Sequence, residues 1–466
     1  MMCKKELLLS KGRASCVINF KIFLDLISNK VVRLTHSKNV LGYSLAAFFA
    51  FSTFLLFWPG FYSNDSFVQL SQARSGNFST WHPPFTALLM RGLYEICGVG
   101  GLLLLNQFLY WAGIWRFLIL IKKNYLISLI IIGFFPPIYT LTLHVWKDAV
   151  LIVFFLWAVN FLLSLKKSGR HLDLFLYLLF SMLCILVRIN AFIPIFVLSI
   201  IGYFYLKENF QFRTVLRSIV VSLLIVVFSI SFSSILNKAL NAKIDNPLPS
   251  LLLWDIAGIG NNAKIKIDLP DYASTKNLNK NFNWQNEYDP AVCSICWRGV
   301  NCNFPSKYNK NLIAEWSILV LSHPKAYLKH RCSLAMLLYG LTPSVQYYPY
   351  HSFQQAMASN AEFHPSYLGL KAEESLNTLN GYLIKIHLYQ YPIYFLISLF
   401  VLVTSIYKVK SRYYEYLLPI MLSSTGLVSA GSLFFISVAA DYRYIAFSVF
   451  TSLLSLVSLF SLSSKK

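Results

Sequence analysis

Asp65 is the first residue of the chain whose type and place could do chemistry. It follows the first long apolar segment and stands upstream of Trp81-His82-Pro83-Pro84. Residues 65–74 are predicted to form a short helix along the membrane surface, and a carboxylate at its start can act as a helix cap. It can also act as a general base that takes a proton from a hydroxyl nucleophile. The residues alone leave both interpretations open.

Three further turns hold charged or amide side chains beside apolar segments: Lys147 with Asp148, Arg188 with Asn190, and Asp441 with Arg443. A lysine and a carboxylate at a helix start can serve capping and snorkelling alone. They can equally present a cation to a phosphate and a carboxylate to a sugar. An arginine at such a depth is costly unless it faces protein, water or an anion. Because all these turns fall on one predicted face, we expect a shared site at the membrane interface.

The elements that must position these residues are predicted membrane-spanning helices. The chain has 466 residues, of which 56% are hydrophobic and 13% charged, against about 25% charged residues in soluble domains. A helix needs about 20 apolar residues to cross a bilayer. The sequence therefore predicts an all-α polytopic membrane protein with ten spans, near residues 41–58, 100–121, 124–141, 149–165, 172–187, 190–206, 214–236, 391–407, 414–437 and 444–462.

The formal net charge of +22 would suggest a nucleic-acid partner in a soluble protein. Here basic residues follow alternate spans, at Lys122, Lys166, Lys207 and Lys408, and cytoplasmic loops of membrane proteins are rich in Lys and Arg. We therefore predict that the chain lies in a lipid bilayer with both ends in the cytoplasm, and that it does not bind nucleic acid. Residues 1–40 are predicted to be a cytoplasmic, interfacial segment without a cleavable signal peptide.

The opposite face receives the larger connecting segments. Residues 41–236 are predicted to form a transmembrane module with a first outer loop at 59–99, residues 237–390 a mixed outer domain, and residues 391–466 the last spans. Loops as long as 237–390 are rarely without structure. In an oxidising compartment its cysteines would form one or two disulfides, and the pairing stays open among Cys293, Cys296, Cys302 and Cys332. A zinc or redox Cys-x-x-Cys site is the alternative, but no second ligand pair stands at a fitting distance.

The four turns together resemble the GT-C superfamily of membrane glycosyltransferases, whose sugar donor is linked to polyprenyl phosphate. Members share an Asp in the first outer loop, which Asp65 matches, and many bacterial relatives follow it with a His-Pro-Pro element, as at His82. Similar segments of such proteins match Lys147-Asp148, Arg188-x-Asn190, Tyr442-Arg443-Tyr444 and His323-Pro324-x-x-Tyr327-x-x-x-Arg331. Many members carry two adjacent acidic residues where this chain has Asn64-Asp65. Since a lone carboxylate is a poor divalent-metal site, no metal or other cofactor is predicted.

The resemblance implies inverting transfer of the sugar to an acceptor hydroxyl. Asp65 would be the catalytic base, and the polyprenyl phosphate would leave. The side chains implied in binding substrate and phosphate are His82, Lys147, Asp148, Arg188, Asn190, Asp441 and Arg443. The lipid tail would lie in a groove between spans, and the outer domain would select the glycan acceptor. The resemblance implies an acceptor on the outer face of the bacterial inner membrane: surface polysaccharide, O-antigen or a lipid-linked glycan.

Two other classes fit the same composition. A transporter or flippase for lipid-linked sugars would need ionisable groups near the bilayer midplane, whereas the charges here gather at the ends of the predicted spans. An O-antigen polymerase or ligase would also have many spans, a large outer loop and basic residues for a lipid diphosphate. Asp65 and the Trp-His-Pro-Pro element favour the glycosyltransferase.

Overall fold

The computed structural model describes residues 38–122, 125–274, 284–296, 298, 300–342, 353, 357, 363–410 and 414–463. Within these ranges the chain forms helices and three isolated β-bridges, and no strand. Eight of the described helices are long and apolar enough to cross a membrane. The prediction of an all-α polytopic membrane protein is thus confirmed, whereas most of the predicted segment 1–40 lies outside the described residues.

The eight candidate spans match eight of the ten predicted segments. They are Lys38–Phe57; Pro84–Leu120, which joins α3 (Pro84–Cys97), η1 (Gly98–Gly100) and α4 (Gly101–Leu120); α7 (Lys147–Ser168); Ile189–Lys207, which joins η2 (Ile189–Ala191) and α9 (Phe192–Lys207); α10 (Phe212–Ala239); Tyr391–Val409 of α16 (Tyr391–Lys410); Tyr414–Ile436, which joins η7 (Tyr414–Tyr416) and α17 (Leu417–Ile436); and Tyr442–Leu462 of α18 (Tyr442–Ser463).

The other two predicted segments form shorter helices. α8 (His171–Val187) has 17 residues and is apolar. Residues 124–141 are divided into α5 (Leu126–Gly133) and α6 (Pro136–Thr142). The break falls just before Pro136 and Pro137, because a proline has no N–H for the preceding turn and its ring clashes with that turn's carbonyl.

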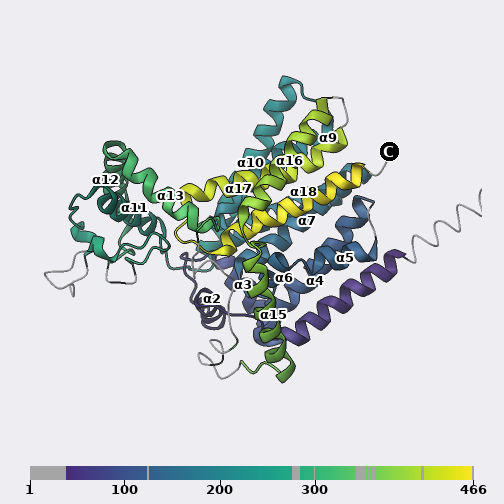
Figure 1. Cartoon of the computed structure of the whole chain (residues 1–466), viewed down its shortest axis with the longest axis horizontal. Coiled ribbons are helices and arrows are strands. Elements are labelled where there is room, and N and C mark those ends of the chain that lie inside the picture. Colours follow the sequence, from purple (N-terminus) through teal and green to yellow (C-terminus); the bar gives the residue numbers. More distant parts are fainter. Residues whose placement is uncertain are drawn as a thin grey trace, which may run out of the picture.

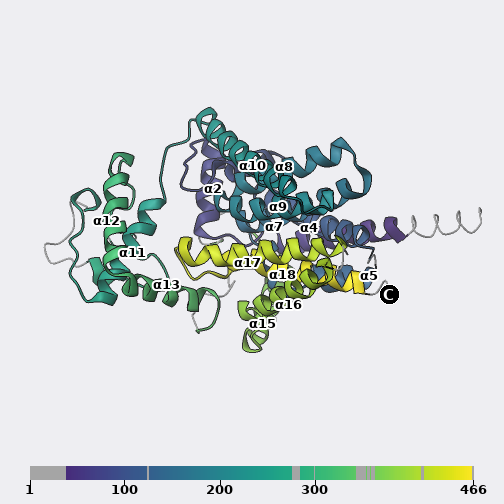
Figure 2. The same cartoon turned by 90° about the horizontal axis from the view of Figure 1, so that it is seen from above.

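A helical cap stands at one end of the bundle, as Figures 1 and 2 show. We define the cap as the described residues between 242 and 342. Its helices are α11 (Leu248–Ala263), α12 (Asn309–Ser322) and α13 (Pro324–Leu338), with short 3-10 turns η3 (Asp271–Ala273), η4 (Trp284–Glu287) and η5 (Ser306–Tyr308). The start of the first span and the end of α18 both lie at the opposite end of the bundle. Which end faces the cytoplasm stays a prediction.

The described segment immediately before α16 lies against the bundle. Helix α15 (Tyr367–Lys385) lies against the end of the first span, and its Ala372 and Leu376 pack, as Leu56 does, against a buried cluster that includes Phe57 and Phe61. The contact is close, since a Cβ added at Gly369 would stand 2.7 Å from the carbonyl oxygen of Leu56.

One disulfide, Cys296–Cys302, closes a short loop of the cap. Cys293 is a buried free thiol and Cys332 an exposed one. The bond removes Cys296 as a zinc ligand. Within the described ranges, no three His, Cys, Asp or Glu side chains are grouped so that they could hold a metal ion.

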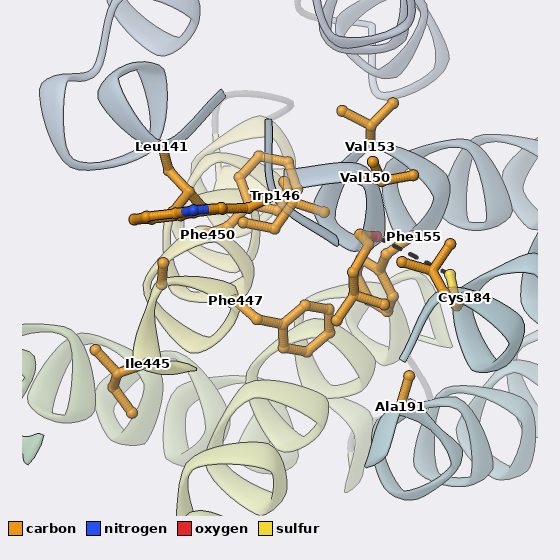
Figure 3. Packing of buried hydrophobic residues seen from close by; sticks show 14 of the residues in the cluster. Leu141, Trp146, Val150, Val153, Phe155, Cys184, Ala191, Ile445, Phe447 and Phe450 are labelled. Carbon is orange, nitrogen blue, oxygen red and sulfur yellow. Dashed lines mark hydrogen bonds between the residues drawn. The ribbon is translucent and has the colours of Figure 1, made fainter. Parts of the chain in front are cut away.

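The centre of the bundle is α7, which is apolar on every side. In its most apolar stretch 89% of the residues are buried, and in that of α18 72%, against 17% in α10. A helix that is apolar all round is stable only inside a core or in lipid. Figure 3 shows Phe155 of α7 facing Phe447 of α18, and their rings are 4.8 Å apart. These two most buried spans begin at the same end of the molecule, at Lys147 and Tyr442. Their packing therefore fixes the positions of their first residues relative to one another.

Candidate functional site

The first loop and the turn before α7 are joined by backbone and side-chain hydrogen bonds. Phe61 N–H donates to the Leu143 carbonyl (3.0 Å), and Val145 N–H donates to the Phe61 carbonyl (2.9 Å). The Ser66 hydroxyl donates to the Val145 carbonyl at 2.8 Å. Trp146 Nε1–H donates to Ser63 Oγ at 2.8 Å. These hydrogen bonds join two segments about 80 residues apart in sequence into one structural unit.

Asp65 lies in the first turn of α2 (Asn64–Ser75), the helix predicted at 65–74. Ser63 is the N-cap residue and forms a capping box with Ser66. The partial positive charge of a helix N-terminus stabilises a nearby carboxylate. The Asp65 side chain is 32% exposed. The helix start thus holds an ionised group that solvent still reaches.

Arg443, from the first turn of α18, meets this carboxylate across 378 positions of sequence. Its Nη1–H donates to Asp65 Oδ2 at 2.7 Å. Its Nε lies 2.9 Å from Asp441 Oδ2. The guanidinium also lies over the rings of Trp146 and Tyr444, 5.3 and 5.2 Å from their centroids. Two carboxylates and two aromatic faces therefore orient a cation whose side chain is only 14% exposed.

His82 and Lys147 stand on the other side of Asp65. Lys147 Nζ lies 2.9 Å from His82 Nδ1, and His82 Nε2 lies 3.7 Å from Asp65 Oδ1. When Lys147 is protonated it can only donate; Nδ1 then accepts, and the His82 proton sits on Nε2, which faces the carboxylate. The three side chains form a chain of polar groups whose last link, at 3.7 Å, is longer than a hydrogen bond.

The charge states of these groups follow from burial and from their neighbours. Burial raises the pKa of the Asp65 carboxyl, but the charges of Arg443, of a protonated His82 and of Lys147 hold that pKa below its ordinary value. Burial lowers the pKa of His82 to about 4, and the charge of Lys147 acts in the same direction. At neutral pH the site therefore contains an Asp65 carboxylate and a neutral His82.

Asp148 and Arg188 form a second ion pair beside the first. The carboxyl of Asp148 is 2% exposed and contacts the Arg188 guanidinium directly. That guanidinium lies 4.8 Å from the ring centroid of Tyr444, the ring that Arg443 also covers. Asn190 is half-buried in η2, two residues further on. The eight residues named from the sequence thus come from four turns that meet at the cap end of the bundle.

Sequence reasoning gave no role to Trp146 and Tyr444, although both adjoin residues that it named. Trp146 precedes Lys147, and Tyr444 follows Arg443. An aromatic residue next to a cation at a helix start is a usable signal, because arginine stacks on aromatic faces. Tyr444 contacts both arginines and so connects the two ion pairs.

The chain matches no protein-family model, no curated protein and no solved structure. Its function therefore has to be argued from the site. The site contains the partly exposed carboxylates of Asp65 and Asp441 and the buried one of Asp148. It also contains two half-buried arginines, a lysine and a neutral imidazole, all at one end of a membrane bundle. Such a set can accept a proton from a hydroxyl and hold an anion next to it.

Proposed function

We propose that the chain is an inverting membrane glycosyltransferase of the GT-C type, which transfers a sugar from a polyprenyl-phosphate donor to an acceptor hydroxyl. The observation that carries the proposal is the contact between Asp65 and Arg443, with Lys147 and His82 beside it. In an inverting transfer the acceptor oxygen attacks the anomeric carbon as the phosphate leaves it. The base for the acceptor and the cations for the phosphate therefore have to lie this close together.

In the reaction, Asp65 accepts the proton of the acceptor hydroxyl as the acceptor oxygen forms a bond to the anomeric carbon. The bond from that carbon to the phosphate oxygen breaks, and its electron pair leaves with the polyprenyl phosphate. Arg443 and Lys147 stabilise the charge that develops on the phosphate. The proton on Asp65 then passes to water, which reaches this half-exposed side chain.

The charges of the free site suggest how the donor would activate the base. In the free site both arginines already contact carboxylates, Arg443 those of Asp65 and Asp441 and Arg188 that of Asp148. A bound phosphate would compete with Asp65 for the guanidinium of Arg443. Losing that partner would raise the pKa of Asp65, so the carboxylate would become a stronger base only when donor is present.

The setting of this reaction is the outer face of a bacterial inner membrane, with both chain ends in the cytoplasm. The donor's lipid tail would lie beside the lipid-facing spans, of which α10 is the most exposed. The acceptor would approach from the cap side, and a surface polysaccharide such as O-antigen is the class that we favour.

Replacing Asp65 by Asn tests the proposal. The amide keeps the shape of the side chain but cannot take the proton, so transfer should fall about 100-fold or more. The measurement is the rate of sugar release from polyprenyl-phosphate donors carrying different sugars, in proteoliposomes with a glycan acceptor. Asp173→Asn is a matched control, because this aspartate pairs with Arg170 at the far end of the bundle. Transfer at the wild-type rate by the Asp65 variant would contradict the proposal.

A further inference from the structure

The cap is bonded to the turn that carries Asp441 and Arg443. Val292 and Ala439 form an antiparallel bridge. Cys293 N–H donates to the Val438 carbonyl (2.9 Å), and Ala440 N–H donates to the Ala291 carbonyl (2.7 Å). The backbone of the cap therefore holds this turn immediately before the first residue of the site.

A buried arginine of the cap reaches the same turn. Arg331 of α13 donates from Nη1 to the Ser437 carbonyl at 2.9 Å. Its Nη2 lies 2.6 Å from Oδ1 of Asp255 in α11. Neither side chain is accessible to solvent, with exposures of 0% for Arg331 and 1% for Asp255. One guanidinium thus connects two helices of the cap to the peptide four residues before Asp441.

Other groups complete the network and fix the direction of the guanidinium. His330 Nε2–H donates to Asp255 Oδ1, and Trp316 Nε1–H donates to Asp255 Oδ2, both at 2.9 Å. The Tyr288 hydroxyl donates to His330 Nδ1 at 2.7 Å. A buried polar network in which each member has partners is rigid.

A second set of hydrogen bonds ties the beginning of the cap to the loop that carries His82. Thr80 N–H donates to the Lys243 carbonyl at 2.9 Å. The Ser79 hydroxyl and the Asn303 amide donate to the two oxygens of Asp245, at 2.7 and 2.8 Å. The cap is therefore fastened to both chain segments whose side chains flank Asp65.

We propose that Arg331, held by Asp255 and His330, is a positioning residue that sets where Arg443 meets Asp65. Burying an ion pair seldom adds stability over apolar side chains of the same size, whereas a guanidinium gives a fixed direction to the carbonyl that it binds. A displacement of about 1 Å at a reacting group can cost about 100-fold in rate. This inference rests on the proposed function, because it assigns Arg331 to the same reaction.

Arg331→Lys keeps the charge but loses the second N–H of the fork. The expected result is a kcat lowered about 10- to 100-fold, by the misplacement argument above, with the KM for donor nearly unchanged. Amide hydrogen exchange at 438–440, followed by mass spectrometry without substrate, should become faster. Arg298→Lys is the matched control, because this arginine forms an exposed ion pair with Glu287 in the same cap. It should change neither quantity.

Tyr288→Phe is the second test of the positioning role, for use if the lysine variant does not fold. It removes only one hydroxyl from the network. It should act in the same direction with a smaller effect. Unchanged exchange at 438–440 in the folded variants would overturn the positioning role, as would faster exchange with an unchanged kcat. Failure of the proposed function is a different result: absence of transfer by the wild-type chain, or full transfer by Asp65→Asn.

Discussion

The molecule contains two clusters with the same three residue types, Asp, His and Arg, and the two differ in how closed they are. In the cap, Asp255 lies 2.6 Å from Arg331 and 2.9 Å from His330, and all three side chains are inaccessible. At the site, Asp65 is 32% exposed and lies 2.7 Å from its arginine but 3.7 Å from its histidine. The closed cluster is inaccessible to a reactant, whereas the carboxylate of the open cluster is partly exposed to solvent. Residue types alone therefore do not separate a closed polar network from one that is open to solvent.

The largest expected effect that tests this comparison is the loss of stability when the closed cluster is disrupted. Asp255→Asn leaves the buried Arg331 without its counter-ion, which should cost about 3–5 kcal/mol of unfolding free energy. The same substitution at Asp65 breaks a more exposed pair and should cost under about 1 kcal/mol. Unfolding of both variants in detergent by SDS titration measures the difference. Equal losses would show that the two clusters are not distinct in this way.

Much of this arrangement could be predicted from the sequence, but not the pairing within it. The apolar segments and the four charged turns are visible in the sequence. The two prolines at 136 and 137 also indicate the break that divides the predicted span 124–141. That Arg443 meets Asp65, and Arg188 meets Asp148, depends on how α7 and α18 pack. A sequence fixes which residues start a helix, but not the rotation of that helix against its neighbours.

The cap network was visible in the sequence only in part, because the resemblance includes Arg331 but gives no role to Asp255 or His330. Asp255 stands within Leu-Leu-Leu-Trp-Asp-Ile-Ala-Gly-Ile-Gly, residues 251–260. A carboxylate in so apolar a helix has to be paired, since burying an unpaired charge is costly. Its partner could have been sought among the basic residues of the cap, such as Arg331. The Cys296–Cys302 pairing had no comparable signal, because three cysteines lie within ten positions of each other.

The open cluster should respond to the loss of its arginine in both rate and pH dependence. Arg443→Gln removes the cation that we propose stabilises the leaving phosphate, and transfer should fall about 100-fold or more. It also removes the charge that lowers the pKa of Asp65. A base with a lowered pKa stays ionised further into acid, so the wild-type rate should fall only below the ordinary range of a carboxyl, near pH 4. In the variant, burial acts with less opposition, and the acid limb should move to higher pH.

The measurement is kcat/KM of each protein, which reports the pKa values of the free enzyme, from pH 3 to 8 and divided by its own maximum. Arg298→Gln in the cap is the control for removal of a surface charge, and its profile should match the wild type. An acid limb at the same pH in Arg443→Gln and the wild type would mean that Asp65 is not the group that titrates. The lowered pKa of Asp65 also predicts how stability depends on pH. The ion pair of Asp65 stabilises the fold above the unfolded pKa, and this contribution is lost as the pH falls through the folded pKa.

The smallest effect should come from the tether between the cap and the first loop. Asp245→Ala removes the acceptor for Ser79 and Asn303, at about 1 kcal/mol for each hydrogen bond. The backbone bond from Thr80 to Lys243 stays in place, and the capping box holds Asp65 independently of the cap. Transfer should therefore fall less than in Arg331→Lys, because neither of the two lost hydrogen bonds touches Asp65 or Arg443. Hydrogen exchange should become faster at 79–82 and stay unchanged at 438–440. A larger loss of transfer than in Arg331→Lys would place the main influence of the cap on His82 and would reverse the order of the two tethers.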